Sequence, residues 1–300
     1  MLKEVQQLAL WQRFENRNDL RSERLGALGS LLAGADVDPR RVEPLGRQLE
    51  RARLLHRSDL SREIDGGPTV SRKVFEAVIG RDDRLPRNFL ADGATATNAV
   101  CRVVSLMADG AVSFGTGFSI GPGLIMTNNH VLPSPEIAAR SLVQFGYFLD
   151  SPSSDSRAVS VRLNPNDLFI TNIQLDFTVV SLDRQLSATV YELFGAINLL
   201  PRSGKALTGE AVNVIQHGDG QPQTVSIRDN VVVDVFDDWV HYTSDTSAGA
   251  SGSPVLNDQW QLAALHHAAI EHRAQNGRMV VINEGVRISS IFRKLESNLP

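Results

Sequence analysis

In this 300-residue sequence, the serine best placed to do chemistry is Ser251, because it lies in the tight segment GASGSP. Gly249 lets the backbone turn sharply two residues earlier, which would aim the amides of Gly249 and Ser251 at one point. Two N–H groups so arranged stabilise the charge that develops on a carbonyl oxygen during acyl transfer. A serine hydroxyl is a weak nucleophile at neutral pH and needs a base. Without a base the segment is only a flexible polar loop, and we interpret Ser253 as a turn residue in either case.

Two further segments supply candidates for a base and for a carboxylate beside it. FGTGFSIGPGLIMTNNHVL predicts two short strands with His130 just past the second, where an imidazole can be held rigidly at a cleft. QLDFTVVSL places Asp176 at the start of an apolar strand, where a buried carboxylate is costly unless it has a partner. Asp167 and Asp183 are rival aspartates nearby. The plain alternatives are a surface histidine and an aspartate in a turn at the end of a strand.

The elements that must position these residues are predicted to be β-strands. After about residue 99, short apolar runs are separated by Gly, Pro, Asn and Asp. Many short strands at this spacing predict an antiparallel sandwich or barrel. The tail SSIFRKLESNL returns to four-residue steps of Ile291, Leu295 and Leu299, which predicts a closing helix.

Residues 1 to about 85 have helical periodicity instead. Apolar residues recur at three-residue steps at the start of the chain, at Val5, Leu8, Trp11 and Phe14. Asp38 followed by Pro39 predicts the start of another helix, and GPTVSRKVFEAVIG predicts a short one. We interpret the small and polar residues 86–99 as a linker. The sequence therefore predicts a small helical bundle without evident chemistry and a domain boundary after residue 92.

The order His130, Asp176, Ser251, within the motifs GTGF, TNNHV, LDFTVVSL and GASGSPV, resembles the chymotrypsin/trypsin-like serine peptidase superfamily. The likeness covers residues 97–298 and is strongest to bacterial, disulfide-free peptidases of the glutamyl-endopeptidase type. It implies a chymotrypsin-like double antiparallel β-barrel. The expected fold class is α+β and multidomain. It has a small N-terminal helical bundle of an effector-associated type in residues 1–92, and a serine protease domain with a C-terminal helix in residues 93–300.

The resemblance also implies a role for each residue. Ser251 would attack the peptide carbonyl, His130 would accept and return its proton, and Asp176 would orient the imidazole. The amides of Gly249 and Ser251 would bind the oxyanion. Trypsin-like digestive enzymes have Asp before the catalytic serine, where this sequence has Ala250. The activation switch that depends on that Asp is therefore excluded, and the N-terminal helices become the expected regulatory element.

Two residues near Ser251 match the specificity pocket of glutamyl endopeptidases: Thr246, five positions before the serine, and His266, fifteen positions after it. Both can donate to a carboxylate or an amide oxygen, so the resemblance favours Glu, Asp or Gln before the scissile bond. Asp245 stands where trypsin has the aspartate that binds Lys or Arg, which favours a cation. Pairing of His266 or His267 with Asp245 would make the pocket nearly neutral. The plain alternative for Thr246 and His266 is an ordinary strand residue. We interpret four other histidines as structural or surface residues: His56, His217, His241 and His272.

Composition excludes several classes of function. The net charge of -4 lacks the one-sided basic character of nucleic-acid-binding proteins. No run approaches the roughly 18 apolar residues of a membrane span, and the first residues do not resemble a signal peptide. The single cysteine, Cys101, cannot form an internal disulfide, and no cluster of His, Cys or carboxylates has zinc spacing. We therefore expect a cytoplasmic protein with no metal or other cofactor, no membrane contact and no nucleic-acid partner.

These observations lead to hypotheses from two different classes. The first is a cytoplasmic serine endopeptidase that acts on a protein or peptide substrate and meets a protein partner through residues 1–92. Its domain order is similar to that of bacterial effector proteases of conflict and antiphage systems. The alternative is a peptidase-like binding module with little or no turnover. A periplasmic chaperone-protease of the HtrA type is disfavoured, because we see neither a signal peptide nor a C-terminal peptide-binding domain.

Overall fold

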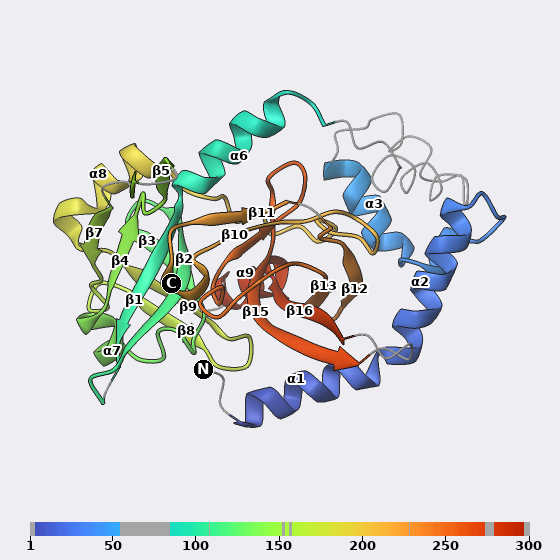
Figure 1. Cartoon of the computed structure of the whole chain (residues 1–300), viewed down its shortest axis with the longest axis horizontal. Coiled ribbons are helices and arrows are strands. Elements are labelled where there is room, and N and C mark those ends of the chain that lie inside the picture. The colour runs from blue at the N-terminus through green and yellow to red at the C-terminus, as the bar shows by residue number, and fades with distance from the viewer. Residues whose placement is uncertain are drawn as a thin grey trace.

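The computed structural model describes residues 4–54, 85–107, 109–151, 154–155, 158–227, 229–273 and 279–296. Within these ranges, N-terminal helices precede two seven-stranded antiparallel sheets, and one further helix follows them (Figure 1). The expected fold class, with helices before a chymotrypsin-like double barrel and a helix after it, is confirmed. No helix in these ranges is long and apolar enough to cross a membrane.

The first sheet has the strand order β7-β4-β1-β2-β3-β9-β8. Its strands are β1 (Val100–Leu106), β2 (Val112–Gly121), β3 (Leu124–Thr127), β4 (Leu142–Phe145), β7 (Val159–Arg162), β8 (Phe169–Asn172) and β9 (Phe177–Ser181). Along β1, Cys101 and Val103 are fully buried whereas Arg102 between them is only half-buried, as the two-residue period of a strand requires. Burial raises the pKa of the Cys101 thiol, so this cysteine is a core residue.

The second sheet has the strand order β11-β10-β14-β15-β16-β13-β12. Its strands are β10 (Asn213–Gln216), β11 (Thr224–Ser226), β12 (Val232–Phe236), β13 (Trp239–Tyr242), β14 (Pro254–Leu256), β15 (Leu262–Arg273) and β16 (Met279–Arg287). The longest pairing joins β15 to β16, with a register shift between His266 and Ala268. Inside the sheet, Val214, Val240 and Val255 belong to one buried cluster.

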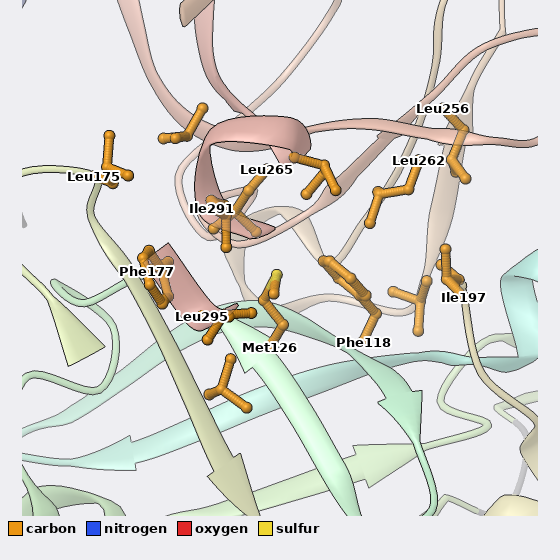
Figure 2. Close-up of a cluster of buried hydrophobic side chains, with 14 of the residues drawn as sticks. Phe118, Met126, Leu175, Phe177, Ile197, Leu256, Leu262, Leu265, Ile291 and Leu295 are labelled. Atoms are coloured by element: carbon orange, nitrogen blue, oxygen red, sulfur yellow. The ribbon is translucent and has the colours of Figure 1, made fainter. Parts of the chain in front are cut away.

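Another buried cluster joins the two sheets and the C-terminal helix α9 (Ile288–Glu296) (Figure 2). Phe118 and Met126 come from the first sheet, Leu265 comes from the second, and Ile291 and Leu295 come from α9. The four-residue spacing of the helical tail therefore marks the face that packs on both sheets, as expected. Because this core fixes one sheet against the other, residues at the edge of their junction are held in a defined geometry.

Two helices within the β domain were missed by the sequence analysis. They are α7 (Pro135–Arg140) and α8 (Arg184–Phe194), and short elements β5 (Leu149–Ser151), β6 (Ser154–Asp155) and η3 (Gly218–Gly220) also lie outside the main sheets. The Ser134 hydroxyl caps α7 by accepting from the Ile137 amide, and the Asp183 carboxylate caps α8 by accepting from the Gln185 amide. Both helices are short and mostly exposed, so they lack a long apolar stripe.

The N-terminal helices lie beside the second sheet (Figure 1). They are α1 (Glu4–Asn16), α2 (Asn18–Leu32), η1 (Pro39–Arg41) and α3 (Leu45–Leu54). Leu10 and Phe14 of α1 share a buried cluster with Val233, Ile270 and Ile282 of the sheet. The apolar stripe expected on α1 was therefore mostly wrong. Of Val5, Leu8, Trp11 and Phe14 only Phe14 is buried, because the helix packs on the sheet through the face that carries Leu10.

The expected linker at residues 86–99 is a helix, α6 (Asn88–Asn98). Phe89 packs against Trp260 with ring centroids 4.9 Å apart and the ring planes tilted by 37°, and the Trp260 indole N–H donates to the Phe89 carbonyl at 2.8 Å. Small residues favour this packing, since a Cβ on Gly93 would overlap the Trp260 ring. The proposed boundary after residue 92 falls inside this helix. The helix expected at residues 67–80 lies outside the described residues.

Candidate active site

The three residues singled out by the sequence come together at the junction of the two sheets. His130 follows β3, and Asp176 immediately precedes β9, so both belong to the first sheet. Ser251 lies in the loop before β14 and belongs to the second. His130 and Ser251 line one cavity of about 380 Å³, formed by Val112, Ser113, Phe114, His130, Val131, Asp219, Ala248, Gly249 and Ser251. The site is therefore assembled from both barrels.

Asp176 holds His130 at two points. The Nδ1 atom of His130 lies 2.7 Å from Oδ2 of Asp176, and the His130 amide donates to Oδ1 at 2.9 Å. Burial opposes ionisation of Asp176, but hydrogen bonds from His130 and His267 outweigh it and lower its pKa to about 2. An ionised carboxylate only accepts, so Nδ1 of His130 carries a proton, and the lone pair of the neutral imidazole is on Nε2. This is the state that a general base requires.

The segment before His130 is anchored by its polar side chains. The Thr127 hydroxyl donates to the Thr116 carbonyl at 2.7 Å, and the Asn128 amide donates to the Asp176 carbonyl at 2.8 Å. Asp176 has φ +43°, a left-handed conformation that the Asn128 bond helps to hold. The sequence analysis missed Asn128, although its place two residues before His130 in TNNHV was visible.

The two rival aspartates have other partners. Asp167 accepts from Nε of Arg184 at 2.7 Å on the surface, and Asp183 caps α8. Neither is bonded to His130 among the described residues. The carboxylate of this site is therefore Asp176.

The loop that carries Ser251, residues 249–253, is hydrogen-bonded to β2. Thr116 donates its hydroxyl to the Gly249 carbonyl and its amide to the Ser251 carbonyl, both at 2.9 Å. Gly249 and Gly252 have φ +92° and +87°, values that favour glycine. A Cβ on Gly252 would also overlap the Thr116 carbonyl oxygen, so no larger residue fits there. Ser253 is buried, and its backbone bonds stabilise the same turn, as expected of a turn residue.

The amides of this loop divide into bonded and free groups. The Ala250 amide donates to the Ser247 carbonyl at 3.0 Å, and the Gly252 amide donates to the His266 carbonyl at 3.1 Å. Within the described ranges the amides of Gly249 and Ser251 donate to no protein group. The loop therefore has two unpaired N–H groups, one on Ser251 and one two residues before it, and an oxyanion site requires donors of this kind.

His130 and Ser251 share the cavity without a direct hydrogen bond among the described residues. Such a bond often tightens only when substrate is present, so the free geometry does not remove His130 from the role of base.

His267 does not lie where the sequence analysis placed it. Its Nδ1 atom is 2.7 Å from Oδ2 of Asp176, the same oxygen that holds His130. The structure does not bring His267 to Thr246 or to Asp245. The register of β15 shifts between His266 and Ala268, and at this irregularity the two neighbouring histidines have different partners.

The other expected pocket residues have these contacts. The Thr246 hydroxyl donates to Oδ1 of Asn283 at 2.6 Å, and the Asn283 amide donates to the Ser244 carbonyl at 2.8 Å. His266 is buried with Nδ1 2.6 Å from the Tyr242 hydroxyl, and burial lowers its pKa to about 3. Asn283 was not expected from the sequence.

Asp245 has an exposed side chain, and its backbone carbonyl accepts from the Gln216 amide at 2.8 Å. Neither His266 nor His267 pairs with it in the part of the chain that the structure describes. Both histidines have other partners, the Tyr242 hydroxyl for His266 and the Asp176 carboxylate for His267. Neither histidine therefore neutralises Asp245.

Two of the four remaining histidines are buried. Nδ1 of His217 is 3.0 Å from the Gln221 carbonyl, and burial lowers its pKa to about 4. His241 is bonded to Glu284, as described below. His56 and the side chain of His272 lie outside the described residues.

His130, Asp176 and His267 also offer three metal-ligand atoms within 4.8 Å of one another. Both Nδ1 atoms already donate to Asp176, and a cation would have to replace both protons. The hydrogen bonds account for the cluster, and the absence of a metal stays a prediction.

Comparison with known proteins adds a family to this geometry. Residues 115–265, half of the chain, match the family described as trypsin-like peptidase domain. The chain belongs to the trypsin-like peptidase family. The expected superfamily and a peptidase domain are thereby confirmed, whereas the finer likeness to glutamyl endopeptidases stays a prediction.

Two curated relatives resemble this trypsin-like peptidase. The uncharacterized protein y4fB of Sinorhizobium fredii is 37% identical over 255 residues, which are 81% of this chain and 37% of that protein. The secreted RxLR effector protein 73 of Plasmopara viticola is 32% identical over 190 residues, which are 57% of this chain and 45% of that protein. The chain therefore spans less than half the length of these relatives.

Solved structures share the fold of this chain. A serine endoprotease from Yersinia pestis superposes with a TM-score of 0.51 at 16% identity, over 71% of this chain and 67% of that one. Deg5 superposes with a TM-score of 0.50 at 14% identity, over 70% of this chain and 94% of that one. These likenesses concern architecture alone.

Proposed function

We propose that this chain is a serine endopeptidase whose catalytic triad is Ser251, His130 and Asp176. The observation that carries the proposal is the carboxylate of Asp176, which fixes both the ring and the backbone of His130. Ser251 in the same cavity, with two unpaired amides beside it, supports the assignment of nucleophile and oxyanion site.

The chemistry follows from these positions. Ser251 Oγ attacks the peptide carbonyl while Nε2 of His130 takes its proton. Asp176 stabilises the imidazolium and is not itself protonated. The oxyanion accepts from the amides of Gly249 and Ser251, and loss of one such donor typically raises the barrier by about 2.7–4 kcal/mol. His130 then protonates the leaving amine, and water releases the acyl group by the same route in reverse.

We infer that the residue before the scissile bond carries an uncharged amide. Asn283 uses its own N–H to bind the Ser244 carbonyl, so it can only accept from Thr246. The hydroxyl proton of Thr246 is then committed, and its oxygen can accept from an amide N–H but cannot donate to a carboxylate. The low pKa of His266 keeps it neutral at pH 7, which also favours Gln over Glu.

We further propose a biological setting, in which this is a regulated effector protease of the bacterial cytoplasm with a role in antiphage defence. Residues 1–92 would be its regulatory or adaptor domain and residues 93–300 its protease domain. A bacterial relative at 37% identity and the helices packed on the second sheet support this setting. Phage challenge of bacteria that express either the natural chain or Ser251→Ala tests it, with protection expected only from the natural chain.

Peptide mapping tests the activity. The purified chain and the Ser251→Ala variant are incubated with an unrelated cell lysate, and new peptide termini are identified by mass spectrometry. We expect termini that depend on Ser251, with Gln enriched before each cut. Cuts after Glu or after Lys and Arg would overturn the specificity. Binding of lysate proteins by both forms without new termini would favour a binding module with little turnover.

A further inference from the structure

Glu284 on β16 is a buried carboxylate held by residues of the N-terminal helices. Arg13 of α1 donates to both its oxygens, from Nη2 to Oε1 at 2.5 Å and from Nε to Oε2 at 3.1 Å. The side chain of Glu284 has no exposed surface. Burial opposes its ionisation, but hydrogen bonds from His241 and Arg13 outweigh this and lower its pKa. Glu284 is therefore an anion whose counter-charge comes from α1.

His241 links Glu284 to the second helix. Nη1 of Arg21, on α2, lies 3.0 Å from Nδ1 of His241, and Nε2 of His241 lies 3.0 Å from Oε2 of Glu284. An arginine only donates, so Nδ1 must accept and the proton of His241 sits on Nε2, directed at Glu284. Arg21 therefore selects the tautomer that stabilises Glu284.

His267 lies between Glu284 and the proposed triad. Its Nδ1 donates to Oδ2 of Asp176, and its Nε2 is 3.8 Å from Oε1 of Glu284. Trp239 also connects Arg13 to His267. The Arg13 guanidinium lies 3.8 Å from the centroid of the Trp239 ring, and the centroid of the His267 ring lies 5.3 Å from it. The position of His267 is thus set by two groups that Arg13 holds.

We propose that helix α1 positions the catalytic pair, with Arg13 and Glu284 acting through His267 on Asp176. This inference rests on the function proposed above. Oδ2 of Asp176 accepts hydrogen bonds from both imidazoles, so displacement of His267 would change the geometry of the bond between that oxygen and His130. Arg13, Glu284 and His267 are positioning residues, because none of them lines the cavity that holds Ser251.

A matched control lies one turn further along the same chain. Arg17 binds buried Asp234 through Nε at 2.6 Å and Nη2 at 2.9 Å. The side chains of Arg13 and Arg17 are 24% and 20% exposed, and both acids are fully buried. Both arginines attach the N-terminal helices to the second sheet, but among the described residues Arg17 has no contact with Glu284 or His267. Loss of docking alone would therefore affect both variants, although Asp234 keeps a second partner in Arg24 when Arg17 is replaced.

The experiment measures how fast Ser251 reacts with a fluorophosphonate probe in the full chain. Ser251 Oγ forms a bond to phosphorus, fluoride leaves, and His130 accepts the serine proton, so the rate reports the pair without a known substrate. Rate constants are divided by the folded fraction of each variant. We expect Arg13→Gln and Glu284→Gln to react about ten- to a hundredfold more slowly than the natural chain. Arg17→Gln should stay within about twofold of it.

Rescue and a spectroscopic readout keep the test decisive. Arg13→Lys should recover part of the rate, because it retains the charge. His267→Asn keeps an N–H near the Nδ1 position and should react faster than His267→Leu. Proton NMR of the natural chain should show two strongly deshielded signals, from the Nδ1 protons of His130 and His267 that are bonded to Asp176. These signals should be shifted in Glu284→Gln, even in a form that does not react.

Three outcomes are distinguished. Equal rates for Arg13→Gln and the natural chain, or equal losses in Arg13→Gln and Arg17→Gln, would overturn the role of α1. If Arg13→Gln does not fold, natural rates and natural deshielded signals in Glu284→Gln would overturn it. Failure of the natural chain to react at Ser251 would instead refute the proposed peptidase, while the NMR comparison would still decide whether Glu284 positions Asp176.

Discussion

Among single residues, Asp176 is the most constrained side chain of the site. It accepts from two imidazoles and one amide, and it keeps a left-handed backbone. Asp176→Asn has the same shape but presents an NH2 group to one of its donors. It would also favour the wrong tautomer of His130, so we expect kcat to fall about 10⁴-fold with the fold retained. Steady-state kinetics on a peptide found by terminus mapping measures this, and a loss below tenfold would argue against the triad.

Two buried histidines make the stability of the protein sensitive to acid. Burial lowers the pKa of His217 to about 4 and of His266 to about 3, against about 6.5 in the unfolded chain. Between pH 6.5 and 4 the unfolded chain binds more protons, so the free energy of unfolding falls as pH falls. The two sites together give a slope of up to about 2.7 kcal/mol per pH unit.

Urea unfolding at a series of pH values measures this slope. His217→Gln should reduce it by about half, and an unchanged slope would assign the acid sensitivity to other groups. Asp176 acts in a lower window, because its pKa of about 2 lies below the unfolded value. Its stabilisation is complete above about pH 4 and is lost as pH falls through 2.

Among elements, the loop before β14 depends on glycine. Gly252→Ala would place a methyl group against the Thr116 carbonyl in a left-handed backbone, so the loop must leave β2. We expect a loss of about 1–3 kcal/mol in stability and of nearly all probe reactivity at Ser251. Gly121→Ala, which has open space around it, is the control. Natural reactivity in Gly252→Ala would show that the attachment of this loop to β2 is unnecessary.

The sequence predicted the strands and the three site residues because both have local signals. Short apolar runs separated by Gly, Pro, Asn and Asp mark the strands, and His130, Asp176 and Ser251 each lie in a motif of their own. It did not predict α6, since Gly93 and its small neighbours resemble a loop until Trp260 is placed beside them. It also missed the second donor to Asp176, because a hydrogen bond across 91 residues has no spacing signature.

For the whole molecule, the N-terminal helices supply charge to the interior of the second sheet. Glu284, Asp234 and Glu210 are buried and paired with Arg13, Arg17, Arg24 and Arg51. Breaking a buried pair costs about 3–5 kcal/mol, so losing several exceeds the total stability of many domains. We therefore expect a chain without residues 1–54 to be insoluble or unfolded, as measured by soluble yield and thermal unfolding. A soluble truncated chain that labels Ser251 faster than the full chain would instead show that these helices inhibit the site.

The Arg13–Glu284 bond joins positions 271 residues apart. During synthesis α1 is made early, whereas β16 emerges only after nearly every other strand. Contacts at such sequence separation form late and slow the final stage of folding. A nascent chain therefore carries His130, Asp176 and Ser251 before the contact between α1 and β16 can align them. If the proposed triad is correct, the site would become competent only after these two elements have met.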